Sequence, residues 1–259
     1  MTNSISFDRA ADFYDQTRDL AEPVATRGLP ALLKLLAPGA TGRLLDVGIG
    51  TGRIAGPLLD RGADVIGIDL SLKMMAKLRA KKPAVRIAQA DASRLPFADH
   101  TFDAALTTHV LHLIGPWRAA LREFKRVIKP GGVYLNAWHH HQDRSVGQAL
   151  RDEWHARLRA RGVDGRRPGA QQPDEIIAEL KTLGDFEEIE LVRYPTTSTA
   201  RFELERIASR VMSDAWQVPE EIYDVTLNET RDWAAREYGD LDRLVVEDRR
   251  FIAQIVRFN

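Results

Sequence analysis

Short apolar runs alternate with helical patterns through the first half of the chain. The helical patterns, over residues 54–61, 71–80 and 116–128, separate runs that are short and apolar enough to be buried strands. Strands that alternate with helices imply right-handed crossovers and a parallel sheet covered on both faces. We therefore predict a doubly wound α/β sheet over residues 1 to about 140. The predicted strands are residues 43–47, 64–69, 85–90, 102–107 and 133–138.

The alternation stops after Trp138. Helical patterns return at 173–183, 202–216 and 219–238, and two further strands are expected at 187–194 and 249–258. We interpret the added helices as lid insertions into one domain, because the chain contains no repeat or linker that would mark a second one. The predicted organisation is a single domain over 1–259, with a core at 1–140, helical lid insertions at 141–185 and 200–240, and the last strands at 186–195 and 248–258.

Composition narrows the function. The 37 basic and 37 acidic residues cancel, so no overall field favours nucleic acid or an anionic membrane as a partner. The chain has no cysteine, which excludes disulfides, thiolate nucleophiles and zinc-finger sites. The first residues are polar and no apolar stretch is long enough to span a bilayer, so a cytoplasmic location is expected.

The segment LLDVGIGTGR, residues 44–53, is the main candidate for a ligand site. A strand that ends in Gly48, Gly50 and Gly52 lets the backbone turn sharply and approach a ligand, while the next helix directs its first N–H groups at the same space. A glycine-rich turn can also serve only to join strand to helix. The turn by itself therefore leaves both readings open.

Three acidic residues add chemistry to this turn. Asp69 ends the second predicted strand, where a carboxylate can accept hydrogen bonds from ribose hydroxyls, although it could instead cap a helix beside Ser71. Asp46, at the end of the first strand, suits a cationic amino group better than a pyrophosphate. Asp91, after the third strand, is placed to receive an adenine amine. The spacing G-x-G-x-G also differs from the nicotinamide-binding G-x-G-x-x-G, whose last glycine would fall at Arg53.

The ordered motifs DVGIGTG, GIDLS, QADASRLPF, FDAALTTHVLHLI and KPGG resemble the class I S-adenosylmethionine-dependent methyltransferases, in particular the branch similar to quinone-biosynthesis C-methyltransferases. The resemblance covers residues 7–140 and implies a mostly parallel seven-stranded sheet, the Rossmann-like methyltransferase fold. It implies that the glycine turn and Asp46 hold the methionine end of the cofactor. Asp69 and Leu70 would hold the ribose, and Asp91 and Ala92 the adenine. The remaining candidates for cofactor binding are Thr51, Met74 and Thr108.

The N-terminal segment matches a family pattern through Phe7, Asp8, Ala11, Tyr14 and Asp15. By that resemblance Tyr14 and Arg18 would cover the cofactor, with Arg18 pairing the methionine carboxylate. The alternative is an amphipathic helix that only covers the sheet.

Histidines are the candidates for proton transfer. His109 and His112 follow the fourth predicted strand, and their spacing of three would place both on one side of a helical turn; either could be a general base or line the pocket. Three further histidines, 139–141, follow the fifth strand. Neighbours in an extended chain alternate faces, so we expect one wall contact from them and no metal site.

The sequence thus predicts methyl transfer from S-adenosylmethionine to a small molecule by in-line displacement. The alternatives are an NAD(P)-dependent oxidoreductase, which the missing third glycine disfavours, and a cofactor-binding protein without activity. The arginines between Arg144 and Arg167 could meet an anionic acceptor, but interleaved acids favour a solvated helix. The aromatic residues Trp154, Trp216, Tyr223 and Trp233 could form an acceptor pocket or belong to a core.

Overall fold

The chain forms two compact units in the computed structural model, which describes residues 3–18, 20–36, 42–141 and 144–259. The first, here the sheet unit, comprises residues 1–139, 168–192 and 251–259. The second, here the helical unit, comprises residues 140–167 and 193–250. The predicted lid at 141–185 therefore divides: residues 168–185 belong with the sheet. The division into one domain with lids remains a prediction.

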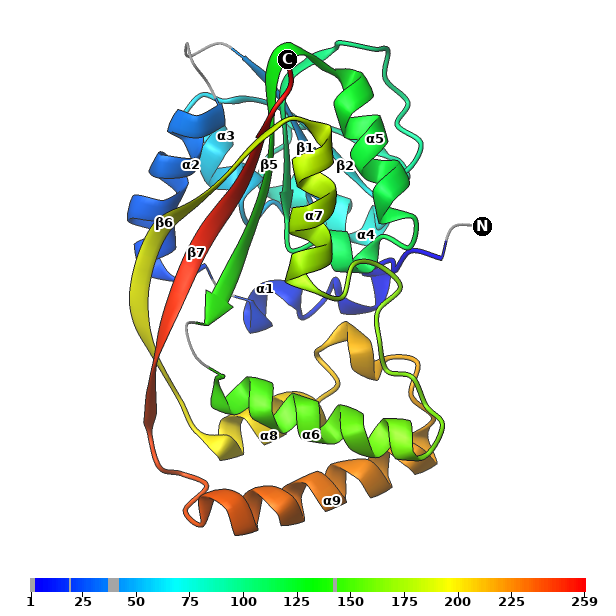
Figure 1. Cartoon of the computed structure of the whole chain (residues 1–259), viewed down its shortest axis with the longest axis vertical. Helices are drawn as coiled ribbons and strands as arrows, with labels where there is room; N and C mark the ends of the chain where they lie inside the picture. The colour runs from blue at the N-terminus through cyan, green and yellow to red at the C-terminus, as the bar shows by residue number, and fades with distance from the viewer. Residues whose placement is uncertain (1–2, 19, 37–41, 142–143) are drawn as a thin grey trace. The chain divides into compact units, whose positions relative to one another are not determined.

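One sheet of seven strands organises the fold, in the order β3-β2-β1-β4-β5-β7-β6 (Figure 1). Strands β1 to β5 pair in parallel, with β1 between β2 and β4. The Gly131 N–H donates to the Phe258 carbonyl at 2.7 Å and the Phe258 N–H to the Gly132 carbonyl at 3.0 Å. These bonds pair the start of β5 with the end of β7, so β7 runs antiparallel. The strands are β1 Arg43–Val47, β2 Asp64–Asp69, β3 Arg86–Gln89, β4 Phe102–Thr108, β5 Ile128–His141, β6 Asp185–Ser198 and β7 Val245–Arg257.

This arrangement confirms the predicted doubly wound, mostly parallel α/β sheet. The first four predicted strands agree with the structure to within one residue at each end. The fifth, β5, begins five residues earlier than predicted, because Pro130 and the two glycines after it lie inside the strand rather than before it.

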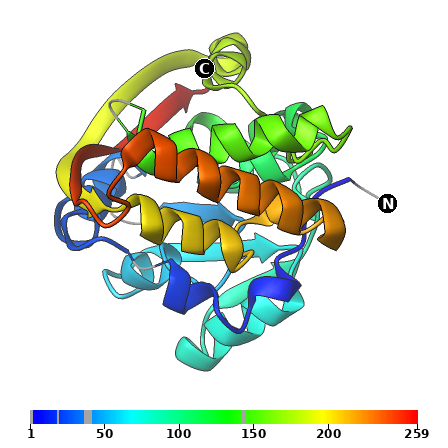
Figure 2. The same cartoon turned by 90° about the horizontal axis from the view of Figure 1, so that it is seen from below.

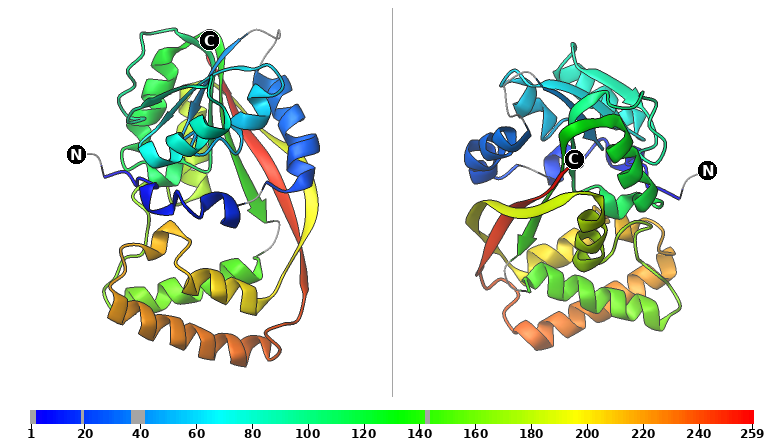
Figure 3. Two further views of the ribbon diagram at one scale, coloured as in Figure 1. Left: turned by 180° about the vertical axis from the view of Figure 1, so that it is seen from behind. Right: turned by 45° about the horizontal axis from the view of Figure 1, so that its top comes forward.

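Helices cover both faces of the sheet in this unit (Figures 1 and 3). Helices α5 and α7 lie on one face, and α2, α3 and α4 lie on the other. The longer helices are α2 Leu29–Leu36, α3 Ala55–Leu59, α4 Leu72–Lys81, α5 Trp117–Val127 and α7 Pro173–Leu183. The short ones are η1 Asp8–Ala10, α1 Tyr14–Thr17, η2 Val24–Gly28 and η3 Leu111–Leu113.

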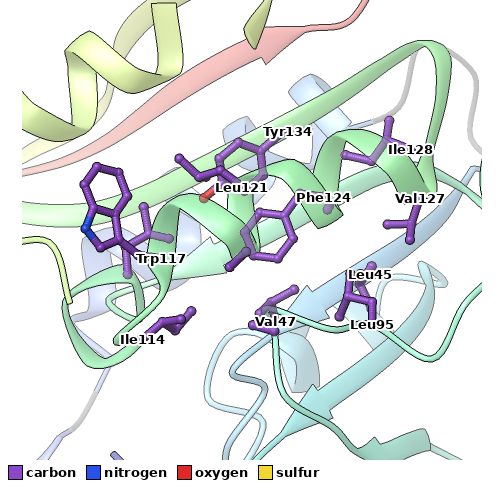
Figure 4. Packing of buried hydrophobic residues seen from close by; sticks show 14 of the residues in the cluster. Leu45, Val47, Leu95, Ile114, Trp117, Leu121, Phe124, Val127, Ile128 and Tyr134 are labelled. Atoms are coloured by element: carbon purple, nitrogen blue, oxygen red, sulfur yellow. The ribbon is translucent and has the colours of Figure 1, made fainter. Parts of the chain in front are cut away.

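Helix α5 shows why these elements pack. Its buried residues Trp117, Leu121 and Phe124 recur at helical spacing and lie on one side of the helix. Figure 4 shows Leu121 beside Tyr134 of β5 and Phe124 near the β1 residue Val47, with Trp117 at the other end of the same cluster. The carboxyl end of β1 is therefore held rigidly from this face of the sheet.

The helical unit has its own core. Helices α6 Val146–Ala160, α8 Ala200–Ala208 and α9 Glu220–Tyr238 pack against one another, with the short helix η4 Ser213–Ala215 between the last two in sequence (Figure 2). Trp154 and Tyr223 are buried among aliphatic side chains, and the Trp154 indole donates to the Thr226 hydroxyl at 3.1 Å. These two aromatic residues are therefore core residues. None of the helices within the described ranges is both long and apolar enough to cross a membrane.

Candidate functional site

The glycine turn after β1 takes a conformation that side chains would obstruct. Gly48, Gly50 and Gly52 have φ values of 78°, 55° and 78°, in the left-handed region that favours glycine. A Cβ at Gly48 would lie 2.6 Å from the Val110 side chain, so the close approach also requires glycine. The Gly48 N–H donates to the Ile68 carbonyl at 2.8 Å, which ties the turn to the end of β2.

Asp69 closes this turn. Its two carboxylate oxygens accept the Gly50 N–H and the Ser71 N–H, each at 2.8 Å. Burial raises the pKa of Asp69, and the backbone N–H groups that it binds lower the pKa in part. Ser71 itself caps α4 by accepting the Met74 N–H at 3.1 Å. Asp69 therefore both supports the loop and keeps lone pairs that could accept ribose hydroxyls, since a carboxylate has about four acceptor sites.

A small pocket lies at the carboxyl end of β1, with Tyr14 of α1 and Thr108 of β4 in its wall. Its volume of about 30 Å³ corresponds to no more than one or two water molecules. The predicted segment 44–53, together with Tyr14 and Thr108, accounts for this lining except for Ile54, which the turn into α3 brings to it. The complete lining is Tyr14, Asp46, Gly48, Ile49, Gly50, Thr51, Arg53, Ile54 and Thr108.

Two polar groups in this pocket, the Thr108 hydroxyl and the Asp46 carboxylate, are buried. The Thr108 hydroxyl is buried and has no hydrogen-bond partner within the described part of the chain. Asp46 is 4% exposed, and burial together with the nearby charge of Asp69 raises the pKa of Asp46 to about 7. Buried polar groups are normally satisfied, so these two indicate a place where a ligand completes the hydrogen bonding.

The N-terminal segment reaches this pocket through Tyr14, whose role in covering a cofactor remains a prediction. The Arg18 guanidinium lies 5.2 Å from the centre of the Tyr14 ring and 5.9 Å from that of Phe7. Asp15, the next residue after Tyr14, accepts a hydrogen bond of 2.5 Å from the Thr51 hydroxyl inside the glycine turn. Nothing in the sequence indicates this contact, because 36 residues separate its partners.

The other cofactor-binding candidates lie outside the pocket lining. Met74 is buried, with its methyl group 3.5 Å from where a Cβ of Gly50 would stand. The Leu70 carbonyl accepts the Gln89 amide at 2.9 Å. One oxygen of Asp91 accepts both the N–H and the hydroxyl of Ser93, at 2.8 and 2.7 Å, and the next residue, Ala92, is buried. Their roles toward a nucleoside remain predictions.

The histidines after β4 differ from the expected arrangement. The helical turn η3 begins only at Leu111, and His109 before it has φ of 54°, so the prediction that His109 and His112 share one side of a helical turn is wrong. His109 instead pairs with His139 of β5. The His109 Nε2 accepts the His139 N–H at 3.1 Å and lies 2.7 Å from the His139 Nδ1. The catalytic assignments of His109 and His112 stay predictions.

The two described side chains of the run 139–141, those of His139 and His140, have different partners. His139 contacts His109 and Phe251, whereas the ring of His140 lies 3.2 Å from an Arg250 nitrogen. The side chain of His141 lies outside the described residues. Within the described ranges, no three or more residues of the metal-binding types are grouped so that they could hold an ion.

The arginines near α6 are engaged in ion pairs inside the helical unit. Asp214 of η4, whose side chain is 2% exposed, accepts from Arg151 and lies 3.4 Å from Arg167 and 3.2 Å from the His155 ring. Burial raises the pKa of Asp214, but His155 and the two arginines outweigh this and hold the pKa below its usual range. These arginines therefore stabilise the unit's own fold.

Comparison with known proteins matches this architecture to methyltransferases. Residues 45–136 match the family model described as Methyltransferase domain. The chain is 37% identical over 132 residues to a demethylmenaquinone methyltransferase of Renibacterium salmoninarum, covering 51% of this chain and 56% of that protein. It is 36% identical over 128 residues to a malonyl-[acyl-carrier protein] O-methyltransferase of Salmonella typhimurium, covering 49% of each. The chain thus spans about half the length of these relatives.

Solved structures share the fold. The YcgJ protein of Bacillus subtilis superposes with a TM-score of 0.59 at 21% identity, over 89% of this chain and 98% of that one. Phosphoethanolamine N-methyltransferase 2 of Haemonchus contortus, solved with phosphomonomethylethanolamine and S-adenosylhomocysteine, superposes with a TM-score of 0.54 at 21% identity. That match covers 97% of this chain and 58% of the Haemonchus chain. These likenesses support the seven-stranded fold.

Proposed function

We propose that this chain, whose residues 45–136 match a methyltransferase-domain model, transfers a methyl group from S-adenosylmethionine to a small-molecule acceptor. The observation that carries the proposal is the pocket beside the glycine turn. There, Asp46 is buried with a raised pKa, and the Thr108 hydroxyl is buried without a hydrogen-bond partner among the described residues, next to a backbone that only glycine allows.

The donor set of this pocket fits the methionine end of the cofactor. An ammonium group is a donor and a cation, so it would satisfy the buried Asp46 and favour its ionised form. The Thr108 hydroxyl can donate to a carboxylate or accept from an amine. A pyrophosphate is neither a hydrogen-bond donor nor a cation, and its negative charge would repel that of an ionised Asp46.

The nucleoside would then lie along the carboxyl ends of β1, β2 and β3. Asp69 and Leu70 would receive the ribose, and Asp91 with Ala92 the adenine. Met74, packed against the turn, would support the loop, and Tyr14 with Arg18 would cover the methionine end. These roles are the ones assigned from the sequence. The hydrogen bond that Asp69 accepts from the Gly50 N–H supports the ribose role of Asp69, because it holds that carboxylate beside the glycine turn.

When bound, the cofactor supplies a methyl group on a sulfonium whose leaving group is neutral. The chain's own contribution is therefore alignment and the exclusion of water. An acceptor that must lose a proton also needs a base near the ends of β4 and β5. His109 and His112 remain the candidates there, with His139 hydrogen-bonded to the first of them.

The proposal also concerns the chemical class of the methyl acceptor. The two relatives are named for different acceptors, a demethylmenaquinone and a malonyl thioester, and neither aligns beyond about half its length. We propose a small quinone-like or carboxylate acceptor rather than nucleic acid, since basic and acidic residues balance. A cytoplasmic location is part of this proposal, and fractionation of expressing cells would test it.

Calorimetric titration with S-adenosylmethionine and S-adenosylhomocysteine, with NAD⁺ as the control ligand, tests the cofactor. We expect saturable binding of the first two and none of NAD⁺. S-adenosylhomocysteine release is then measured with demethylmenaquinone, malonyl thioesters and a wider acceptor panel. No binding would refute the proposal, and binding without turnover on any acceptor would favour a non-catalytic cofactor-binding protein.

A further inference from the structure

The N-terminal segment is attached to α4 and to the glycine turn at three points. Asp8 accepts the Ser71 hydroxyl at 2.6 Å and the Lys73 N–H at 3.1 Å, at the start of α4. Asp12 pairs with Lys77 at 2.9 Å. A third acid, Asp15, reaches the end of the helix. Because the α4 partners of the three acids recur at four-residue spacing, one face of α4 receives the whole segment.

The third attachment differs from the others because it includes the turn itself. The Thr51 hydroxyl donates to one oxygen of Asp15 at 2.5 Å, and the Lys81 ammonium donates to the other at 2.5 Å. The same ammonium lies 3.3 Å from the Thr51 carbonyl, which closes a ring of three residues. The Asp15 side chain is 45% exposed, against 89% for Asp12, and its partner Thr51 is 2% exposed. Of the three acids, Asp15 is therefore the one whose bonds tie the segment directly to the glycine turn.

The position of Asp15 determines that of Tyr14. The two residues are adjacent in α1, and the Tyr14 ring forms part of the pocket wall. With the segment attached, that pocket has a volume of about 30 Å³, far below the roughly 300 Å³ or more of a typical ligand site. The pocket must widen for a methionine-sized group to enter beside Tyr14, and a displacement of α1 that widens it would break the bonds of Asp15.

We propose that Asp15, Thr51 and Lys81 form a latch that holds the N-terminal segment over the cofactor pocket and sets the rate at which cofactor enters and leaves. Asp15 and Lys81 are positioning residues, which act through Tyr14. The inference rests on the proposed function, since it presupposes that the pocket takes S-adenosylmethionine.

Association and dissociation rates of S-adenosylhomocysteine, measured by stopped-flow or surface plasmon resonance on the full chain, test the latch. We expect Asp15→Ala to raise both rates about 10-fold, the order that follows from losing a hydrogen bond to a charged group, and to change Kd by less than about 3-fold. Lys81→Met should give a smaller rise, because Thr51 still donates to Asp15. High salt should accelerate exchange in the wild type more than in Asp15→Ala.

Asp12→Ala is the matched control, because it removes the same charge from the same segment and frees a lysine of the same helix without touching the turn. Its rates should stay within about 2-fold of wild type. Equal effects of Asp12→Ala and Asp15→Ala, or unchanged rates in Asp15→Ala, would overturn the latch. So would a faster dissociation with unchanged association, which would make the segment a simple contact.

Circular dichroism and thermal melting establish that each variant is folded. If Asp15→Ala does not fold, the exchange rates of Lys81→Met test the latch instead. The Lys81 side chain is half-exposed at the end of α4, so its replacement should leave the fold intact. A wild-type chain that does not bind S-adenosylhomocysteine refutes the proposed function itself, whereas a binding wild type with unaltered variants refutes only the latch.

Discussion

Two buried carboxylates, one in each unit, show opposite electrostatics. Asp214 of the helical unit is surrounded by Arg151, Arg167 and His155, which hold its pKa below the usual range despite burial. Within the described residues, Asp46 of the sheet unit has no such cation beside it, and burial with the charge of Asp69 raises its pKa to about 7. The first carboxylate is held in its ionised form by ion pairs within its own unit. The second is costly to ionise in the protein alone, which is the property expected of a ligand-binding group.

The same contrast separates two neighbouring threonines of β4. The Thr107 hydroxyl bonds the Tyr134 hydroxyl at 2.7 Å and the Asn136 amide oxygen at 3.0 Å inside the core. The Thr108 hydroxyl, one residue later, is buried without a partner in the described chain. Since adjacent strand residues face opposite ways, one threonine serves the core and the other the pocket. At this pair of residues, the hydroxyl on the core side of the strand is hydrogen-bonded and the hydroxyl on the pocket side is not.

The largest effect is expected from removing the ion-paired carboxylate of the helical unit. Asp214→Ala leaves Arg151 and Arg167 without their buried counter-charge and should lower the free energy of unfolding by about 3–5 kcal/mol. Urea unfolding followed by circular dichroism measures it. Asp164→Ala, which removes an exposed carboxylate paired with Arg166, should change the midpoint little. Equal midpoints in the two variants would contradict the structural role of Asp214.

The next largest effect is expected at Asp69, whose carboxylate closes the glycine turn. Asp69→Ala removes the acceptor of the Gly50 and Ser71 N–H groups and the proposed ribose contact, so S-adenosylmethionine should bind about 100-fold more weakly, or about 2–3 kcal/mol. Calorimetry gives the affinity. Asp103→Ala is the control, because Asp103 also accepts a backbone N–H, from Arg43, but at the amino end of β1. Unchanged affinity in a folded Asp69→Ala would remove Asp69 from the site.

The raised pKa of Asp46 predicts a pH dependence of cofactor affinity. A cationic amine binds the ionised carboxylate, whose population falls as pH drops through about 7, so binding below pH 7 must release a proton. The affinity for S-adenosylhomocysteine should rise about 20-fold from pH 5.5 to 7.5. Asp46→Asn should bind more weakly and without this slope. A wild-type affinity that is flat over this range would show that Asp46 does not meet a cation.

The smallest effect is expected at the two threonines. Thr108→Val removes a buried hydroxyl without a partner, so the chain without ligand should be unchanged or up to about 1 kcal/mol more stable, while cofactor affinity falls a few-fold. Thr107→Val should instead destabilise the chain by about 1 kcal/mol and leave the affinity unchanged. Thermal melting measures the stability of both variants, and calorimetry measures their cofactor affinity. If the two variants behave alike, the distinction between core and pocket fails.

The sequence by itself determined the alternation of strands and helices, the glycine turn and the acidic residues at the strand ends. These are local properties: apolar periodicity, backbone conformations that favour glycine and a residue's place after a buried strand are all encoded within a few positions. The turn, Asp46 and Thr108 therefore lie at one pocket, as the order of motifs predicted.

Only the tertiary structure decided which side chains meet across long separations. It joined Asp15 to Thr51, and His109 to His139, over 36 and 30 residues, and it gave Asp214 its cations. Such pairs depend on sheet register and helix packing, which bring together residues that no local pattern relates. The local sequence pattern therefore specifies where a ligand can bind, whereas tertiary packing determines which polar groups remain available to bind that ligand.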